Sequence, residues 1–149
     1  MDYFNKKLKA RREPIPAEGG NVMKDSIVRD WGSGDLLVVY HGTNIDFTEF
    51  DDRYLGEETD HPTSRLGFWF NTEKEAIEDN YSIVKECNLN ITAPVDISLN
   101  DLLLMDEEEL VHDKGEWLEN GHDGLRVFDT EYGGYSYVVF EINQIRILR

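Results

Sequence analysis

The chain has 149 residues, with 31 acidic against 15 basic side chains and a formal net charge of −16. This length fits one domain that buries its own core, and the negative charge disfavours direct binding to a nucleic-acid backbone. The single cysteine excludes an intramolecular disulfide, the Cys/His spacing offers no structural zinc site, and the apolar runs are too short to span a bilayer. We therefore expect a soluble, cytoplasmic protein without a metal or a membrane contact.

Residues 1–35 are expected to form an N-terminal preface, made of a basic arm and a linker with a short helix over residues 22–31. The first twelve residues carry a net charge of +4 and leave −20 for the rest of the chain. Either the arm touches an acidic partner, or its charges are solvated as most charge runs are. Its basic residues are Lys6, Lys7, Lys9, Arg11 and Arg12.

The apolar residues 36–40 are predicted to form a buried strand that delivers His41, Gly42 and Thr43 to its end. Gly42 lacks a Cβ, so a planar ligand could lie against its peptide. The side chains of His41 and Thr43 offer hydrogen-bond donors beside it. A strand followed by an ordinary turn explains the triplet equally well.

A polar surface loop is expected over residues 47–65, followed by an aromatic strand over residues 66–70. Residues 72–75 match a capping box that opens a helix. The apolar residues after the box recur at helical spacing, so the helix is expected to extend through them. They are Ala76, Ile77, Tyr81, Val84 and Cys87.

The C-terminal half is predicted to be mainly β structure, with Gly133-Gly134 marking a hairpin and Asp123-Gly124 forming a structural turn. Strands are predicted over residues 88–93, 125–128, 135–141 and 144–148, and helical stretches over residues 101–111 and 116–119. The sum predicts an α+β fold of short, mainly antiparallel strands with helices at the edges.

Three blocks stand in one order along the chain: His41-Gly42-Thr43, then Gly67-Phe68-Trp69-Phe70 with Tyr81, then Tyr137-Val138-Val139-Phe140. Together they resemble the ADP-ribosyltransferase fold of the diphtheria-toxin and poly(ADP-ribose) polymerase type, especially its small phage-encoded versions. The resemblance spans residues 36–148 and implies a catalytic domain over residues 36–149. It also implies split antiparallel β-sheets with peripheral helices.

The resemblance implies that NAD+ is the substrate and that no metal is needed. Gly42 would bind the nicotinamide carboxamide through its backbone, His41 would bind a ribose hydroxyl, and Thr43 would support the triplet. Trp69 and Tyr81 would sandwich the nicotinamide ring, and His41 and Tyr81 are counted among the catalytic residues. Tyr81 is equally well explained as a core tyrosine, because it shares a helical face with apolar residues.

Four more residues complete the cofactor site that the resemblance implies. Gly67 would allow close backbone approach, Arg65 would reach the diphosphate, and Phe70 and Ser136 would line the site. From strand alternation alone, Phe68 and Phe70 are both expected to pack inward.

The catalytic acid departs from the family pattern, which places it where this chain has Ser136. A carboxylate there stabilises the positive charge that builds on the ribose as nicotinamide leaves. Asp129 or Glu131 in the hairpin is expected to supply it, and Glu141 is a second candidate on the opposite strand face. Alternatively, the chain binds NAD+ without efficient transfer.

The resemblance thus predicts a mono-ADP-ribosyltransferase that modifies a macromolecule, foremost a protein. It could act as a phage effector against a host defence or transcription complex, as an anti-CRISPR protein or as a toxin. The negative charge would suit docking to a basic, nucleic-acid-binding protein. The alternatives are a non-catalytic nucleotide-binding or protein-interaction module on the same fold and a tRNA 2′-phosphotransferase, against which the acidic charge speaks.

Overall fold

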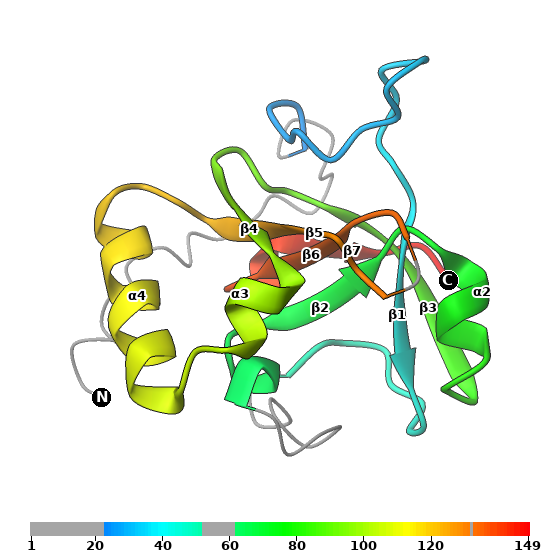
Figure 1. Cartoon of the computed structure of the whole chain (residues 1–149). Helices are drawn as coiled ribbons and strands as arrows, with labels where there is room; N and C mark the ends of the chain where they lie inside the picture. Colours follow the sequence, from blue (N-terminus) through cyan, green and yellow to red (C-terminus); the bar gives the residue numbers. More distant parts are fainter. Residues whose placement is uncertain (1–22, 52–61, 132) are drawn as a thin grey trace.

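A seven-stranded mixed sheet dominates the computed structural model, which describes residues 23–51, 62–131 and 133–149 (Figure 1). The strands are β1 (Val39–Thr43), β2 (Phe68–Asn71), β3 (Ile83–Leu89), β4 (Pro94–Ser98), β5 (Gly124–Phe128), β6 (Ser136–Val139) and β7 (Ile145–Ile147). Their order in the sheet is β4-β5-β6-β2-β1-β3-β7. The predicted α+β class is confirmed.

The expectation of split antiparallel sheets needs two corrections. All seven strands belong to one hydrogen-bonded sheet, and β4 runs parallel to β5 while the other neighbours are antiparallel. The parallel pair arises because helices α3 (Leu99–Leu103) and α4 (Glu107–Glu119) connect β4 to β5. A helical crossover of this kind returns the chain in the same direction.

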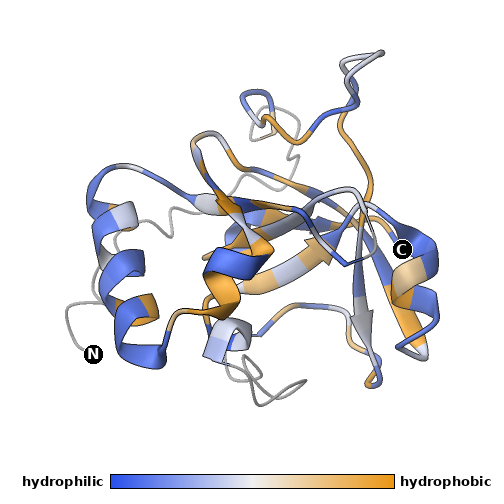
Figure 2. Cartoon of the chain, in the orientation of Figure 1, coloured by the Kyte–Doolittle hydropathy of each residue, from blue (hydrophilic) through white to orange (hydrophobic). Residues whose placement is uncertain are grey.

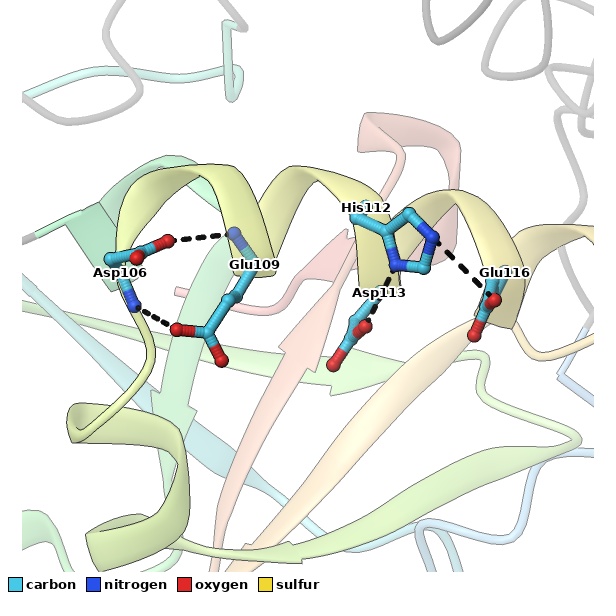
Figure 3. A network of polar contacts seen from close by, with 5 residues as sticks. All are labelled: Asp106, Glu109, His112, Asp113 and Glu116. Atoms are coloured by element: carbon cyan, nitrogen blue, oxygen red, sulfur yellow. Dashed lines mark hydrogen bonds and ion pairs between the residues drawn. The ribbon is translucent and has the colours of Figure 1, made fainter.

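The two helical stretches predicted over residues 101–111 and 116–119 have other bounds, because the first is interrupted after Leu103 and α4 continues from Glu107 through residues 112–115 to Glu119. The Ser98 side chain caps α3, and the Asp106 side chain accepts a hydrogen bond from the backbone of Glu109 to start α4 (Figure 3). Glu109 reaches back to the Asp106 backbone, which completes a capping box. Acidic side chains are favourable at a helix N-terminus, so the acidic residues 106–109 stabilise the start of α4 as well as being solvated. Among the described helices, none has the length and apolar character needed to cross a membrane.

The two faces of the sheet carry separate cores. On one face, side chains from the central strands pack under the segment of residues 23–50, including Val28 and Phe50. On the other face, side chains of β5 and β6 pack against leucines of α3 and α4, and α4 is mostly hydrophilic (Figure 2). The first core includes Val39, Phe68, Phe70, Tyr137 and Val139, and the second includes Leu102, Leu110, Leu118, Leu125, Val127 and Val138.

The helix predicted after residue 72 is wrong in its length and its cap. Helix α2 (Lys74–Glu78) is short, and Val84 and Cys87 lie instead in β3, paired with Gly42 and Val39 of β1. The predicted capping box does not form, because the Thr72 hydroxyl accepts a hydrogen bond from a backbone N–H of the distant β5–β6 hairpin. Pairing with β1 therefore overrides the helical spacing.

The helix predicted over residues 22–31 is also wrong within its described part. Residues 23–25 form a turn, and an isolated bridge joins Arg29 to Leu36. Ser26 and Ile27 bond the backbone near the end of β3, and Val28 is fully buried. Val28 thus packs into the first core, while residues 30–35 are exposed. The predicted basic arm lies outside the described residues.

The remaining strand bounds differ in small ways. The predicted strand over residues 88–93 ends at Leu89, and Pro94 begins β4 instead of ending a strand. The hairpin between β5 and β6 and the final strand β7 are confirmed. Two short 3-10 helices, η2 (Pro62–Arg65) and η3 (Ile142–Gln144), flank β2 and β7.

Candidate functional site

Strands β1 and β2 are neighbours whose described register holds a single pair, Tyr40 opposite Asn71. On its other edge, β1 pairs with β3 along its whole length, from Val39 to Thr43. The sequence predicted that the triplet follows the end of the strand. In the structure the triplet lies inside β1. The described register gives no pairing of His41, Gly42 and Thr43 with β2, and Gly42 and Thr43 are buried.

The His41 side chain reaches from β1 to the backbone of β2. Its Nδ1 lies 2.7 Å from the carbonyl oxygen of Trp69 in β2. A carbonyl oxygen only accepts hydrogen bonds, so Nδ1 carries the proton and Nε2 of the neutral ring is an acceptor. The imidazole is thereby fixed in one orientation with one acceptor nitrogen.

Aromatic rings surround His41 on the face of the first core. Its ring centroid lies 4.9 Å from that of Phe50, 5.4 Å from that of Phe70 and 6.2 Å from that of Phe47. Burial lowers the pKa of His41, and the hydrogen bond with the Trp69 carbonyl opposes this effect only in part. The ring is therefore neutral at pH 7 and available as a hydrogen-bonding group.

Tyr81 packs on Gly42 from the opposite face of the sheet. A Cβ built on Gly42 would lie 2.2 Å from Cδ2 of Tyr81 and 2.8 Å from Cγ2 of Ile77. Only a glycine lets the tyrosine ring approach the strand this closely. The structure thus brings Gly42 and Tyr81 together, while strand alternation sends the His41 side chain to the other face.

Trp69 lies on the same face as Tyr81 but is held by the fold. Its indole Nε1 donates to the Thr63 carbonyl oxygen at 3.0 Å, and its ring packs partly against the second core. Tyr81 and Trp69 were expected to stack on the two sides of the nicotinamide ring. In the structure Tyr81 packs directly on Gly42, and Trp69 is hydrogen-bonded to η2.

An open groove of about 650 Å³ lies between β1 and α2 on the Tyr81 face. Its lining residues are Tyr40, Thr72, Glu73, Lys74, Glu75, Ala76 and Asp79. Lys74 lies above the Tyr40 ring, with Nζ 5.9 Å from the ring centroid, and pairs with Glu86 at 3.5 Å. The groove thus combines an aromatic ring, three acidic residues and the ammonium group of Lys74, which lies over that ring.

Ser136, where the resemblance predicts an acid, is buried and bonded within the fold. Its Oγ accepts a hydrogen bond from Nδ2 of Asn71 at 3.1 Å, and Oδ1 of Asn71 accepts one from the backbone N–H of Glu73 at 2.6 Å. This chain of contacts joins β6 to the beginning of α2. The sequence analysis did not identify Asn71, which directly follows the aromatic block, as part of this network, and it considered Glu73 only within a capping box.

The hairpin acids Asp129 and Glu131 are exposed at the turn between β5 and β6. Asp129 has a φ of +55°, in the left-handed region that aspartate tolerates better than most residues. Two hydrogen bonds tie the hairpin to β2, from the Thr72 N–H to the Tyr135 carbonyl and from the Tyr135 N–H to the Thr72 hydroxyl. The hairpin is thus anchored at its base while its acids face solvent.

Four other predicted site residues have contacts that the fold itself requires. Phe70 is only 1% exposed in the first core, which argues against a ligand contact. The Thr43 hydroxyl bonds the Ile45 backbone, and a Cβ on Gly67 would lie 2.1 Å from a β6 carbonyl oxygen. The exposed Arg65 forms an ion pair of 3.3 Å with a glutamate of α4.

The second candidate acid, Glu141, is almost fully buried and caps η3. Its side chain accepts from the Gln144 backbone while the Gln144 side chain bonds back to Glu141. This reciprocal cap places the Glu141 carboxylate after the C-terminal end of β6, whereas Ser136 begins that strand. Its position argues against a catalytic role beside the groove.

A cluster of His112, Asp113 and Glu116 on α4 offers one possible ligand atom each, all within 4.8 Å of one another (Figure 3). The side chains pair among themselves, with His112 Nδ1 at 3.2 Å from Asp113 and Nε2 at 3.7 Å from Glu116. Both contacts raise the pKa of His112. These ion pairs account for the cluster, which lies at the other end of the sheet from α2 (Figure 1).

Comparison with known proteins links residues 32–148 to one family, described as ADP-ribosyltransferase in polyvalent proteins. Among solved structures, one titled "Crystal structure of an anti-CRISPR protein" has 11% sequence identity and a TM-score of 0.45, covering 76% of this chain and 98% of that one. No curated protein matches the sequence.

Proposed function

Because the chain belongs to the ADP-ribosyltransferases of polyvalent proteins, we propose that it transfers single ADP-ribose units from NAD+ to a protein target. The observation that carries this proposal is the packing of Tyr81 on Gly42 beside the seam between β1 and β2, which His41 bridges to the Trp69 carbonyl. The same seam suits a ligand that needs both stacking and hydrogen bonds.

In this proposal the nicotinamide ring enters the groove beside Tyr40 and stacks on Tyr81. Its carboxamide binds the backbone of Gly42, and the groove carboxylates favour its positive charge. The acceptor nitrogen Nε2 of His41 takes a hydrogen bond from a ribose hydroxyl.

The reaction breaks the bond between the nicotinamide nitrogen and C1′ of the ribose, and the bonding electron pair leaves with neutral nicotinamide. The positive charge left on C1′ is taken by a nucleophile of the target, which loses one proton. Binding in the groove contributes by orientation and by stabilising charge as it moves from the pyridinium to the sugar.

We place the target among basic proteins, including those that bind nucleic acids, because the chain carries a net charge of −16. A phage-type effector that acts in the cytoplasm on a host defence or transcription complex would meet such a target. Association driven by this charge weakens as salt is added.

One observation favours a second function, an NAD+-binding module without turnover. The position of the family's acid holds Ser136, which is 8% exposed and bonded to Asn71. A buried hydroxyl in this place supplies no negative charge to the ribose.

Nicotinamide release and NAD+ binding, measured by chromatography and calorimetry, test the proposal with His41→Ala and a matched control, His122→Ala. Nδ1 of His122 also contacts a backbone carbonyl, that of Ala93, at 3.0 Å. We expect His41→Ala to slow release by about tenfold, the loss of roughly one hydrogen bond, and the control to act like wild type. Equal release by all three proteins would contradict the role of His41, and wild type that does not bind NAD+ would refute the function.

A further inference from the structure

The proposed reaction needs a carboxylate beside the ribose, and the position that the family uses for it holds Ser136. We propose that Glu73 supplies this carboxylate and is a catalytic residue. This assignment rests on the proposed function and names a residue that none of the three sequence blocks contains. Its support comes from the groove, from the Asn71 network and from the hairpin.

Glu73 lines the groove together with Tyr40. Three carboxylates face this groove among the described residues, those of Glu73, Glu75 and Asp79. Glu73 comes directly before α2 as its N-cap residue, whereas Asp79 is the C-cap at the far end of the same helix. Glu73 is therefore the groove acid closest along the chain to β2 and Asn71.

Asn71 connects the backbone of Glu73 to Ser136, where the resemblance predicts an acid. Its Nδ2 donates to the Ser136 hydroxyl at 3.1 Å, and its Oδ1 accepts from the Glu73 N–H at 2.6 Å. Asn71 and Ser136 are both buried and stand opposite each other in the register of β2 and β6. One amide side chain thus fixes the backbone of Glu73 relative to Ser136.

The hairpin holds Glu73 from its other side. A Cβ built on Gly134 would lie 3.3 Å from both Cγ and Oε1 of Glu73, and 2.3 Å from the Thr72 hydroxyl. The carboxylate of Glu73 therefore lies against the hairpin backbone at the edge of the groove. Asp129 and Glu131 occupy the exposed turn of the same hairpin and do not line the groove.

The chemical role follows from this position. As the C1′–nitrogen bond breaks and its electron pair leaves with nicotinamide, the ionised Glu73 carboxylate stabilises the positive charge on the ribose and orients a ribose hydroxyl. When water replaces the target, its oxygen bonds C1′ and its proton passes to Glu73 and then to solvent. The products are nicotinamide, ADP-ribose and one proton.

Glu73→Gln is the decisive variant, because it removes the charge and keeps the shape. Glu78→Gln is its matched control on the same helix, since Glu78 pairs with Lys74 but does not line the groove. Glu131→Gln tests the rival acid of the hairpin. Each protein is assayed for nicotinamide release from NAD+, for NAD+ affinity by calorimetry and for melting temperature.

We expect Glu73→Gln to slow nicotinamide release by about 100- to 1,000-fold, the usual effect of removing one group that stabilises transition-state charge. Its affinity for NAD+ should stay within about threefold of wild type, because the carboxylate acts on charge that develops after binding. Its melting temperature should be unchanged, since Glu73 is exposed. The Glu78 control should release nicotinamide at the wild-type rate.

The outcomes separate this assignment from the proposed function. Wild-type release in Glu73→Gln, or a larger loss in Glu131→Gln, overturns the assignment and leaves the transferase function standing. A wild-type protein that binds NAD+ but releases no nicotinamide overturns the assignment and supports the binding module. A protein that does not bind NAD+ overturns both.

Discussion

Replacing Gly42 by alanine should destabilise the fold through one contact, that of the new methyl group with Tyr81. The added Cβ would lie 2.2 Å from Cδ2 and 2.5 Å from Cγ of the tyrosine ring, far inside van der Waals contact. The ring must then shift away from β1. Cγ2 of Ile77, 2.8 Å from the same point, limits the space left for the methyl group.

Two opposing effects set the size of this change. Overpacking of this kind costs about 1–3 kcal/mol, while alanine is favoured over glycine inside a strand by about 0.5–1 kcal/mol. The free energy of unfolding should therefore fall by about 1–2 kcal/mol. With a urea m-value of about 2 kcal/mol/M, the unfolding midpoint should fall by about 0.5–1 M.

A double-mutant cycle assigns this loss to the tyrosine ring. Urea unfolding is measured for wild type, Gly42→Ala, Tyr81→Ala and the double variant. Without the ring, the methyl group should cost less, and the coupling energy should be about 1 kcal/mol. A midpoint that falls equally in both backgrounds, with a coupling below about 0.3 kcal/mol, would refute the proposed packing of Tyr81 on Gly42.

Two further predictions concern stability. Burial lowers the pKa of His41, so the unfolded chain binds its proton more readily, and stability should fall as the pH drops below the unperturbed value of 6.5. In thermal melts between pH 8 and pH 5, the melting temperature of His41→Gln should fall less than that of wild type. The melting temperature of His112→Gln should fall more, because the raised pKa of His112 stabilises the fold at low pH. The reverse order of slopes would contradict this account. Asp123 accepts hydrogen bonds from the N–H and hydroxyl of Thr92 and from the N–H of Ala93. Asp123→Asn should therefore lower the free energy of unfolding in urea by about 1.5–3 kcal/mol. An unchanged unfolding midpoint would show that these bonds do not stabilise the fold.

Local patterns predicted the C-terminal strands well and the segment after β2 badly. Strands β5 and β6 follow each other in the sequence and pair with each other, and two glycines lie in the turn between them. The hairpin therefore depends only on residues close together in the chain, and the sequence pattern predicts it correctly. Val84 and Cys87 also fit one face of a helix, but in β3 they pair with Gly42 and Val39 of β1, and their spacing of three residues puts their side chains on opposite faces of the sheet. No local pattern shows that partner.

Some residues of the candidate site could be proposed from the sequence and others could not. His41, Gly42, Trp69 and Tyr81 were identified from the three blocks, since residue types and their order are visible along the chain. Glu73 was not, because its relation to Ser136 depends on an asparagine that bonds across 65 positions of sequence. The acids of the hairpin were expected because they come shortly before Ser136 and because small phage-type relatives place an acid there, whereas Glu73 and not these acids lines the groove.

By itself, the sequence determined the α+β class, the charge of the surface and the order of the three family blocks, because these depend on composition and on residues close together in the chain. Only the tertiary structure decided that His41 and Tyr81 approach the seam from opposite faces and that Asn71 joins Ser136 to Glu73. The reason is strand register. A shift of one residue between distant strands would send each of these side chains to the other face of the sheet.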